Sequence, residues 1–271
     1  MAAQSGESFI RLERVSKAFD GLSGETYLAL QEVSIEIRRG DFYCLLGPSG
    51  CGKSTILNLV AGFEKPTTGQ LHVGHRSRGQ SELAPGIDRI MIFQESAAAL
   101  FPWLNVADNI LFGPRLAGVE PGDYEKRLDT YLSMVGLSEH AHKFPFELSG
   151  GMKQRVQIAR SLIMEPDVLL MDEPFAALDA IAKRGLRQEL SRIWQETGKT
   201  IIYVTHDIVE AVLLGTRIAV MSAGPCSRIK REIALDIPRP RAMSNLDFME
   251  AVRTLEALIE EETSELRARA I

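Results

Sequence analysis

Residues 47–54 read GPSGCGKS and constrain the fold more than any other part of the chain. They fit the phosphate-binding loop pattern G-x-x-x-x-G-K-[ST]. The apolar run 42–46 before the loop reads as a strand, and residues 53–61 after it read as a helix that Gly62 closes. Glycines let consecutive backbone N–H groups turn inward around a phosphate chain, and the helix N-terminus adds the positive end of its dipole. We therefore expect a strand–loop–helix unit that binds phosphate groups.

Two side chains at the end of this loop have expected roles in nucleotide binding. Lys53 would bridge the β- and γ-phosphates, and the Ser54 hydroxyl would hold Mg²⁺. The full set of expected contact residues is Gly47, Pro48, Ser49, Gly50, Cys51, Gly52, Lys53, Ser54 and Thr55. The alternative is a glycine-rich turn that binds nothing, and the flanking strand and helix argue against it.

A second metal-binding group is expected where the run VLLMDE, residues 168–173, ends in adjacent carboxylates. Asp172, at the end of this apolar strand, would reach Mg²⁺ through a water molecule. Glu173 points onward, where water would attack the γ-phosphate, so it is the candidate general base. An acidic cap on a buried strand is the alternative, and it is less favoured in a chain that also carries the loop at 47–54.

Composition narrows the class of protein. The chain has 271 residues, 45% of them apolar, which is enough for a sizeable core. Its formal net charge of −5 does not indicate nucleic acid binding. The apolar stretches are far shorter than the roughly 18–20 residues of a membrane span, and the N-terminus lacks the apolar core of a signal peptide. The 3 cysteines have no metal-ligand spacing, so a soluble protein of the reducing cytosol is the simplest interpretation.

Alternation of strand and helix patterns predicts an α/β sheet core. Strands are expected at 9–15, 33–37, 42–46, 71–73, 89–93, 168–171, 200–204, 217–221 and 228–235. Helices are expected at 53–61, 180–197 and 207–214, with a terminal amphipathic helix at 243–266 after a linker at Pro238 and Pro240. The block near 95–164 is helical throughout and reads as an inserted lobe. One of its helices has an apolar face at Tyr124, Leu128, Tyr131, Leu132 and Val135, with Gly136 as its cap.

A second glycine-rich helix start occurs at LSGGMKQR, residues 148–155. Ser149 is a good N-cap residue, and Gly150 and Gly151 allow close backbone approach to a phosphate. A helix that is merely capped is the alternative. The chain therefore carries a second potential anion site far along the sequence from the first.

With these motifs in order, the chain resembles the nucleotide-binding subunits of ABC transporters over roughly residues 9–235. The motifs are GPSGCGKST (47–55), Gln94 in FQES, LSGGMKQR (148–155), VLLMDEP (168–174), ALD (177–179) and THD (205–207). The resemblance implies an α/β P-loop NTPase core, with a mixed sheet flanked by helices, an N-terminal antiparallel β part and an inserted α-helical subdomain. It implies a RecA-like ATP-binding core at 1–94 and 166–235, a helical subdomain at 95–165 and a short helical tail at 236–271.

Several roles follow from the resemblance alone. Gln94 matches a residue that senses Mg²⁺ or the attacking water and couples to the permease. His206 matches the switch histidine that bonds the γ-phosphate, and Asp179 matches a residue that communicates across a dimer. The family often has serine where Ala176 stands, so one hydroxyl contact is missing. Gln94 and His206 each have a structural alternative as polar residues at strand ends.

An aromatic side chain from the N-terminal region is expected to stack on adenine. Phe19 stands at the family position after VSKA, and Tyr27 competes with it. We favour Phe19 and leave Tyr27 open.

In the family, the LSGG stretch of one subunit faces the phosphate-binding loop of another. Ser149 and the N–H groups of Gly150 and Gly151 would then contact the γ-phosphate across a homodimer. Met152 stands where glutamine is commonest, which leaves the phosphate-facing groups intact. The LSGG stretch of one chain would thus complete the ATP site formed by the phosphate-binding loop of the other chain. A monomer should therefore hydrolyse ATP poorly.

The resemblance also implies transport. With no membrane span in the chain, the permease is expected to be a separate polypeptide. The aromatic run 101–113 would face that permease, although a place in the core of the lobe is the alternative. The subunit would sit on the cytoplasmic face of the inner membrane, attached through the permease.

The segments LFPWLNVADNILFG and DEPFAALDA are similar in sequence to those of the nitrate/sulfonate/taurine importer group. There a separate solute-binding protein takes up the cargo, so this chain does not contact it directly. The alternatives are an exporter or lipid-trafficking cassette, an ABC ATPase without a transport role, and a non-enzymatic regulatory module.

Overall fold

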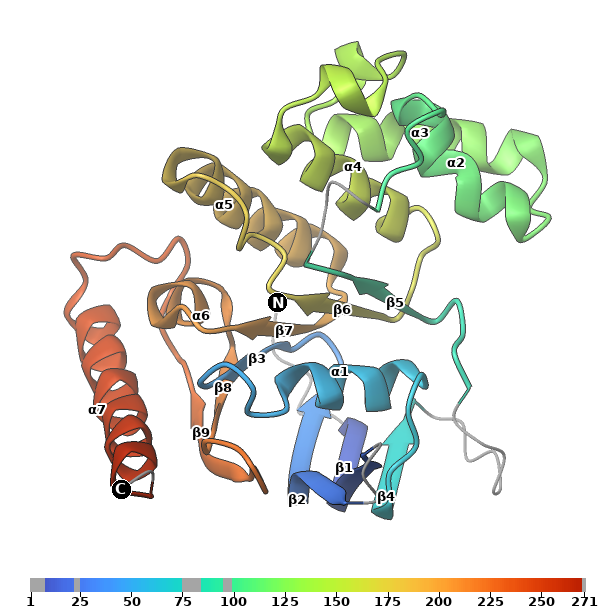
Figure 1. Cartoon of the computed structure of the whole chain (residues 1–271). Coiled ribbons are helices and arrows are strands. Elements are labelled where there is room, and N and C mark those ends of the chain that lie inside the picture. The colour runs from blue at the N-terminus through green and yellow to red at the C-terminus, as the bar shows by residue number, and fades with distance from the viewer. Residues whose placement is uncertain (1–7, 22–24, 75–83, 95–98, 270–271) are drawn as a thin grey trace. The chain divides into compact units, whose positions relative to one another are not determined.

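The computed structural model describes residues 8–21, 25–74, 84–94 and 99–269. The chain forms two compact units, one made of Met1–Gly86 with Thr200–Ile271 and the other of Ile87–Lys199 (Figure 1). We call them unit 1 and unit 2. This division places residues 166–199 in unit 2, whereas the predicted core included them. The predicted domain boundaries stay a prediction, and residues 95–98 at the start of the predicted helical subdomain lie outside the described part.

Unit 1 begins with an antiparallel sheet. Its strands lie in the order β2 (Thr26–Arg38), β1 (Ser8–Asp20) and β4 (Thr68–Val73). β1 pairs antiparallel with both neighbours, and its register with β2 shifts at several points. The structure confirms the predicted N-terminal antiparallel part. The predicted strands 9–15 and 33–37 were too short because they followed only the regular stretches of alternation.

The second sheet of unit 1 holds the phosphate-binding loop. Its strands lie in the order β7 (Thr200–Thr205), β3 (Phe42–Leu46), β8 (Arg217–Met221) and β9 (Ile229–Ala234). β3 is parallel to both β7 and β8, and β9 is antiparallel to β8, so the sheet is mixed. Every residue of β3 and β7 is buried, which explains why both read as continuous apolar runs.

The helices of unit 1 are α1 (Lys53–Ala61), α6 (Ile208–Leu214) and α7 (Leu246–Arg269). Gly62 adopts a left-handed conformation at the end of α1, as the sequence predicted. α7 packs against α6 and β8, and Figure 1 shows it in red at the end of the chain. None of the helices in the described part of the chain has the length and apolar content to cross a membrane.

Two arginines fix the linker between β9 and α7 to the end of α6. Arg239 Nη1 donates to the Leu213 carbonyl oxygen at 2.9 Å, and the Arg241 guanidinium donates to Val212 and Gly215. These are carbonyls of the last helical turn, which lack partners within the helix. Burial and the nearby Arg241 lower the pKa of Arg239 to about 10. The linker therefore attaches the start of α7 firmly to unit 1.

Unit 2 contains a parallel strand pair and a helical block. The strands are β5 (Arg89–Ile92) and β6 (Val168–Asp172). The helices are α2 (Val106–Leu116), α3 (Pro121–Met134), the short η1 (Ser138–His140) and η2 (Pro145–Glu147), α4 (Gly150–Leu162) and α5 (Ala180–Thr197). α2 packs against α3 and α4. Tyr124, Leu132 and Val135 are buried, and Gly136 after α3 has φ 64°, as the helical pattern and its cap predicted.

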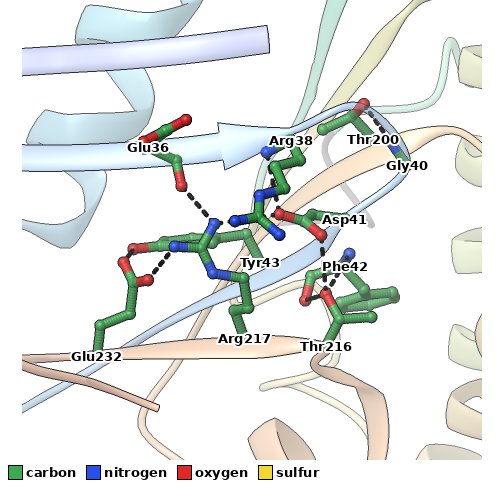
Figure 2. Close-up of polar contacts among 10 residues, drawn as sticks. All are labelled: Glu36, Arg38, Gly40, Asp41, Phe42, Tyr43, Thr200, Thr216, Arg217 and Glu232. Atoms are coloured by element: carbon green, nitrogen blue, oxygen red, sulfur yellow. Dashed lines mark hydrogen bonds and ion pairs between the residues drawn. The ribbon is translucent and has the colours of Figure 1, made fainter. Parts of the chain in front are cut away.

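A polar cluster joins the amino-terminal ends of the central strands of unit 1. Figure 2 shows Arg217 of β8 between Asp41, before β3, and Glu232 of β9. The Arg217 guanidinium also donates to the Glu36 carbonyl oxygen of β2. Arg217 thus ties four neighbouring chain segments together through charge-assisted hydrogen bonds.

Tyr43 extends this cluster into the core. Its hydroxyl donates to Glu232 at 2.6 Å, and its ring lies beside the Arg217 guanidinium. Burial and the Glu232 carboxylate raise the pKa of Tyr43 well above its usual value, so the phenol stays protonated and keeps donating.

Replacing Arg217 should destabilise unit 1, because the half-buried Asp41 and the more exposed Glu232 would both lose their cation. We expect Arg217→Met to lower the free energy of unfolding by about 2 kcal/mol in urea denaturation at pH 7. Arg231→Met, at an exposed position of β9, is the matched control and should change it by less than about 0.5 kcal/mol. Equal losses in both variants would contradict this role for Arg217.

Candidate nucleotide-binding site

The loop between β3 and α1 has the backbone that a phosphate-binding loop needs. Gly50 and Gly52 have φ of 77° and 84°, a left-handed conformation that side chains rarely adopt. A Cβ on Gly52 would also lie 2.7 Å from Leu30 Cδ2, so both space and conformation require glycine there. Successive turns of this kind direct backbone N–H groups into one concavity that suits an anion.

Lys53 lies across this loop. Its side chain is buried, and its Nζ donates to the carbonyl oxygens of Gly47 and Pro48, both at 2.8 Å. Ser54 is exposed and Thr55 half-buried in the first turn of α1, where backbone N–H groups have no partner within the helix. One positive side chain and a helix N-terminus therefore meet at the loop, which favours a phosphate chain as ligand.

Cys51 packs the inside of the loop. Its side chain is fully buried, and its Sγ would lie 2.9 Å from a Cβ on Gly47. Burial raises the pKa of the Cys51 thiol, and the Lys53 ammonium only partly offsets the effect. The thiol is therefore kept neutral, and Cys51 serves the loop as a space-filling residue.

The two aromatic candidates for adenine stacking are cross-strand partners. Phe19 of β1 lies directly opposite Tyr27 of β2, so both rings lie on the same face of the ribbon. Both are exposed, Phe19 by 37% and Tyr27 by 49%. The Lys17 ammonium lies 4.8 Å from the centroid of the Phe19 ring. From the sequence, the two rings were alternatives for stacking on adenine. In the structure they lie next to each other.

His206 is at the same edge of the sheet as the loop. β3 and β7 run parallel with Leu46 paired to Thr205, so the residues that follow, Gly47 and His206, both begin at this edge. His206 is exposed. The next turn is fixed because Asp207 caps α6 by accepting from the Glu210 N–H at 3.0 Å.

Thr205 and Glu210 fix the turn that contains His206. The sequence analysis did not predict this role. The Thr205 hydroxyl donates to Glu210 Oε2 at 2.6 Å and accepts from the Asp207 N–H at 3.0 Å. Both side chains are buried. The sequence signal was present in the run THDIVE, where a strand end is followed by a helix cap.

In unit 2, the carboxylates and Gln94 come from neighbouring strands. β5 and β6 are parallel, with Ile92 paired to Met171, so Gln94 and Asp172 lie at the same edge of this strand pair. Glu173 directly follows β6 with φ 43°, a left-handed conformation that is costly for a residue with a side chain. Backbone outliers of this kind are concentrated at functional sites.

The LSGG stretch begins α4, as predicted. The Ser149 hydroxyl accepts from the Met152 N–H at 3.3 Å and so caps the helix. A Cβ on Gly150 would lie 3.1 Å from Leu178 Cδ2, whereas one on Gly151 would meet Ala182 at an ordinary 3.7 Å. Gly150 therefore lets the start of α4 approach the segment before α5, a packing role that the sequence did not show.

Asp179 lies in that neighbouring segment. Its carboxylate caps α5 by accepting from the N–H groups of Ile181 at 3.0 Å and Ala182 at 2.9 Å. The LSGG stretch and Asp179 are thus close together within unit 2. The candidate residues belong to both units: Phe19, Tyr27, the phosphate-binding loop and His206 to unit 1, and the others to unit 2.

Comparison with known proteins shows the family. The family model described as ABC transporter matches residues 30–176. The taurine import ATP-binding protein TauB of Jannaschia sp. (strain CCS1) is 45% identical over 227 residues, which cover 83% of this chain and 82% of that protein. The nitrate import ATP-binding protein NrtD of Synechococcus elongatus is 43% identical over 242 residues, covering 89% of this chain and 86% of that protein.

Solved structures of similar proteins point to the same family. CbiO1 from Clostridium perfringens, part of an ABC transporter complex, has a TM-score of 0.72 at 28% identity and covers 84% of this chain and 88% of its own. The ATP-binding cassette MJ0796, in a dimeric post-hydrolysis state bound to ADP and Pi, has a TM-score of 0.69 at 31% identity and covers 85% of this chain and 100% of its own.

These matches confirm the P-loop NTPase fold and the family resemblance that the ordered motifs predicted. The family model covers more than half of the chain, and relatives above 40% identity span more than four-fifths of it. The chain therefore belongs to the ABC transporter family, in which it is an ATP-binding and ATP-hydrolysing protein.

Proposed function

We propose that the chain is the ATP-binding subunit of an importer that takes up a small anion or organic solute of the nitrate, sulfonate or taurine type. The observation that carries the ATP-binding part of the proposal is the edge of the unit 1 sheet where the phosphate-binding loop and His206 begin side by side. The import of taurine and of nitrate and the transport of bicarbonate are named for relatives that are 43–45% identical to this chain, which supports the substrate class.

ATP would be held by the loop and the first turn of α1. The proposed phosphate contacts are Gly47, Pro48, Ser49, Gly50, Cys51, Gly52, Lys53, Ser54 and Thr55. Gly50 and Gly52 shape the N–H concavity, and Lys53 needs only to turn from the carbonyls at the loop's start to reach a phosphate. Phe19 would stack on adenine, with Tyr27 beside it as the alternative.

Mg²⁺ would be held by the Ser54 hydroxyl, with Asp172 and Gln94 as the protein's other candidate oxygen donors. A hydroxyl, a carboxylate and an amide suit a hard cation that keeps several waters and shares phosphate oxygens. The bound ion would neutralise charge on the phosphates during hydrolysis.

Hydrolysis would use Glu173 and His206. Glu173 would accept the proton of the attacking water as general base, and the unusual backbone of Glu173 supports a functional reason for its placement. The exposed His206 would donate a hydrogen bond to the γ-phosphate. Loss of the γ-phosphate would break this bond, so the histidine would respond to the state of the nucleotide.

Two copies of the chain would enclose each ATP. Ser149 and the N–H groups of Gly150 and Gly151 would contact the γ-phosphate bound to the loop of the other copy, with Asp179 close to them. The exposed start of α4 supports this, as does the dimeric state of the similar cassette MJ0796. ATP would then close the dimer and its hydrolysis would reopen it.

An aromatic patch of unit 2, defined as Phe101, Trp103 and Phe112, would contact the permease. The ring centroids of Phe101 and Phe112 are 4.3 Å apart, and those of Phe101 and Trp103 are 5.5 Å apart. Trp103 is 71% exposed although indole carries a large apolar surface. Exposure of this degree disfavours the alternative of a core residue and supports a docking role.

The buried Asn109 makes this patch rigid. Its side-chain amide donates to the carbonyl oxygens of Phe101 at 3.1 Å and Leu104 at 2.9 Å, and its Oδ1 accepts from the Phe101 N–H at 2.8 Å. A fixed surface transmits movement of unit 2 to a bound partner better than a mobile one. Through the permease the protein would lie at the cytoplasmic face of the membrane and would work with a solute-binding protein indirectly.

The general-base assignment predicts the behaviour of Glu173→Gln. Glutamine cannot accept the proton, so phosphate release should fall by at least about 100-fold while ATP binding persists and an ATP-bound dimer accumulates. Phosphate-release kinetics and size-exclusion chromatography with ATP measure the two effects. Lys53→Ala is the control and should lose nucleotide binding itself. Phosphate release at the wild-type rate by Glu173→Gln would show that Glu173 is not the base.

The docking role predicts that Trp103→Ala uncouples hydrolysis from transport. The isolated subunit should hydrolyse ATP within about twofold of the wild-type rate, since an exposed side chain adds little to stability. Solute uptake by the complex reconstituted with its permease should fall severely. The control Leu246→Ala removes an equally exposed apolar side chain from α7 and should leave uptake unchanged. Normal uptake with Trp103→Ala would rule the patch out.

A further inference from the structure

The connection between β8 and β9, residues 222–227, borders the phosphate-binding loop. A Cβ on Gly224 would lie only 2.9 Å from the Gly50 carbonyl oxygen. One on Gly47 would lie 3.2 Å from the carbonyl oxygen of Met221, where the connection begins. The 222–227 connection therefore touches the loop at Gly50, and the end of β8 just before it touches the loop at Gly47. A displacement of this connection would move the backbone that forms the phosphate concavity.

β2 holds the second half of the 222–227 connection. The Cys226 N–H donates to the Leu28 carbonyl oxygen at 2.9 Å, and the Gln31 N–H donates to the Ser227 carbonyl oxygen at 2.9 Å. These bonds do not include Ala223 and Gly224, the part that meets Gly50. Ser222 is held by hydrogen bonds with Arg228 just before β9, whereas Ala223 is held by a different contact.

Glu262 of α7 supplies this contact. Its Oε2 accepts from the Ala223 N–H at 2.9 Å, one residue before Gly224. Its Oε1 lies 2.9 Å from Lys230 Nζ of β9. Glu262 is only 5% exposed, and an acidic side chain is rarely buried to this degree unless it is paired. The carboxylate thus links the 222–227 connection to the terminal helix, in addition to the bonds that link it to β2.

We propose that Glu262 is a positioning residue for nucleotide binding. Through Ala223 it holds Gly224 against the Gly50 carbonyl oxygen, and so the terminal helix α7 sets the shape of the phosphate concavity. The inference rests on the proposed binding of ATP at this loop. Because coupling between sites is reciprocal, ATP binding must also stabilise the Ala223–Glu262 hydrogen bond.

Glu261 is a matched control on the same helix. Its carboxylate also lies 2.9 Å from Lys230 Nζ, but its side chain is 62% exposed and pairs with Lys230 rather than with the 222–227 connection. Glu261→Ala and Glu262→Ala remove the same group and weaken the same lysine contact. They differ in the loss of the hydrogen bond to Ala223.

The test is ATP and ADP affinity of the full-length variants, measured by calorimetry, together with KM and kcat for ATP. Glu262→Ala should weaken binding by roughly fivefold or more and raise KM more than it lowers kcat. Glu261→Ala should bind as wild type does. Glu262→Gln retains an oxygen that can accept from Ala223 and should recover most of the affinity. Equal affinities for Glu262→Ala and Glu261→Ala would overturn the proposal.

Lys53→Ala separates this inference from the proposed site. If Lys53→Ala binds ATP normally, the site at the loop is wrong; if it loses binding while Glu262→Ala keeps it, only the role of Glu262 is wrong. Hydrogen exchange of the wild-type chain keeps the inference testable should Glu262→Ala fail to fold. Saturating ATP should slow exchange of the Ala223 amide at least about fivefold. An unchanged exchange rate would overturn the proposal.

Discussion

The left-handed backbone at Gly50 and Gly52 is the constraint on which the nucleotide-binding half of the structure depends. It turns the chain from β3 into α1 and forms the N–H concavity. Neighbouring residues restrict the backbone of this loop, because Leu30 fills the space beside Gly52 and Gly224 lies against the Gly50 carbonyl oxygen. The antiparallel sheet and the mixed sheet therefore both border one short loop, and we propose that the terminal helix also affects its shape.

The residues proposed to act on ATP come from both units of the chain. Unit 1 carries the groups for phosphate recognition, with the loop and His206 at one sheet edge. Unit 2 carries the carboxylates after β6 and the glycines that begin α4. In the proposed mechanism ATP on the loop of one chain also contacts the LSGG stretch of a second chain, so that its binding and loss favour different arrangements of the two chains. A nucleotide with differential contacts in two states is what allows hydrolysis to do mechanical work.

Local sequence patterns predicted the strand and the helix on either side of the phosphate-binding loop. They did not predict contacts between residues far apart in the chain. The bounds of β3 and α1 followed from an apolar run and from the cap at Gly62. β1 and β2 extend well beyond their predicted ranges because register shifts interrupt the alternation of side chains. The hydrogen bond between Ala223 and Glu262 joins residues 39 positions apart. The helix and strand patterns of a sequence do not predict contacts between residues so far apart. The sequence favoured Phe19 over Tyr27 for stacking on adenine, and the structure pairs the two residues across β1 and β2.

The shared site between two chains is tested most directly by mixing two inactive variants. Lys53→Ala disables the loop, and Gly151→Asp places a carboxylate at the start of α4, where an added Cβ meets only an ordinary contact with Ala182. A mixed dimer would still combine one intact loop with one intact LSGG stretch. We predict that each variant alone hydrolyses ATP very slowly and that an equal mixture recovers about a quarter of the wild-type rate, since half of the randomly formed dimers hold one complete site. A mixture no more active than the variants measured separately would contradict the account.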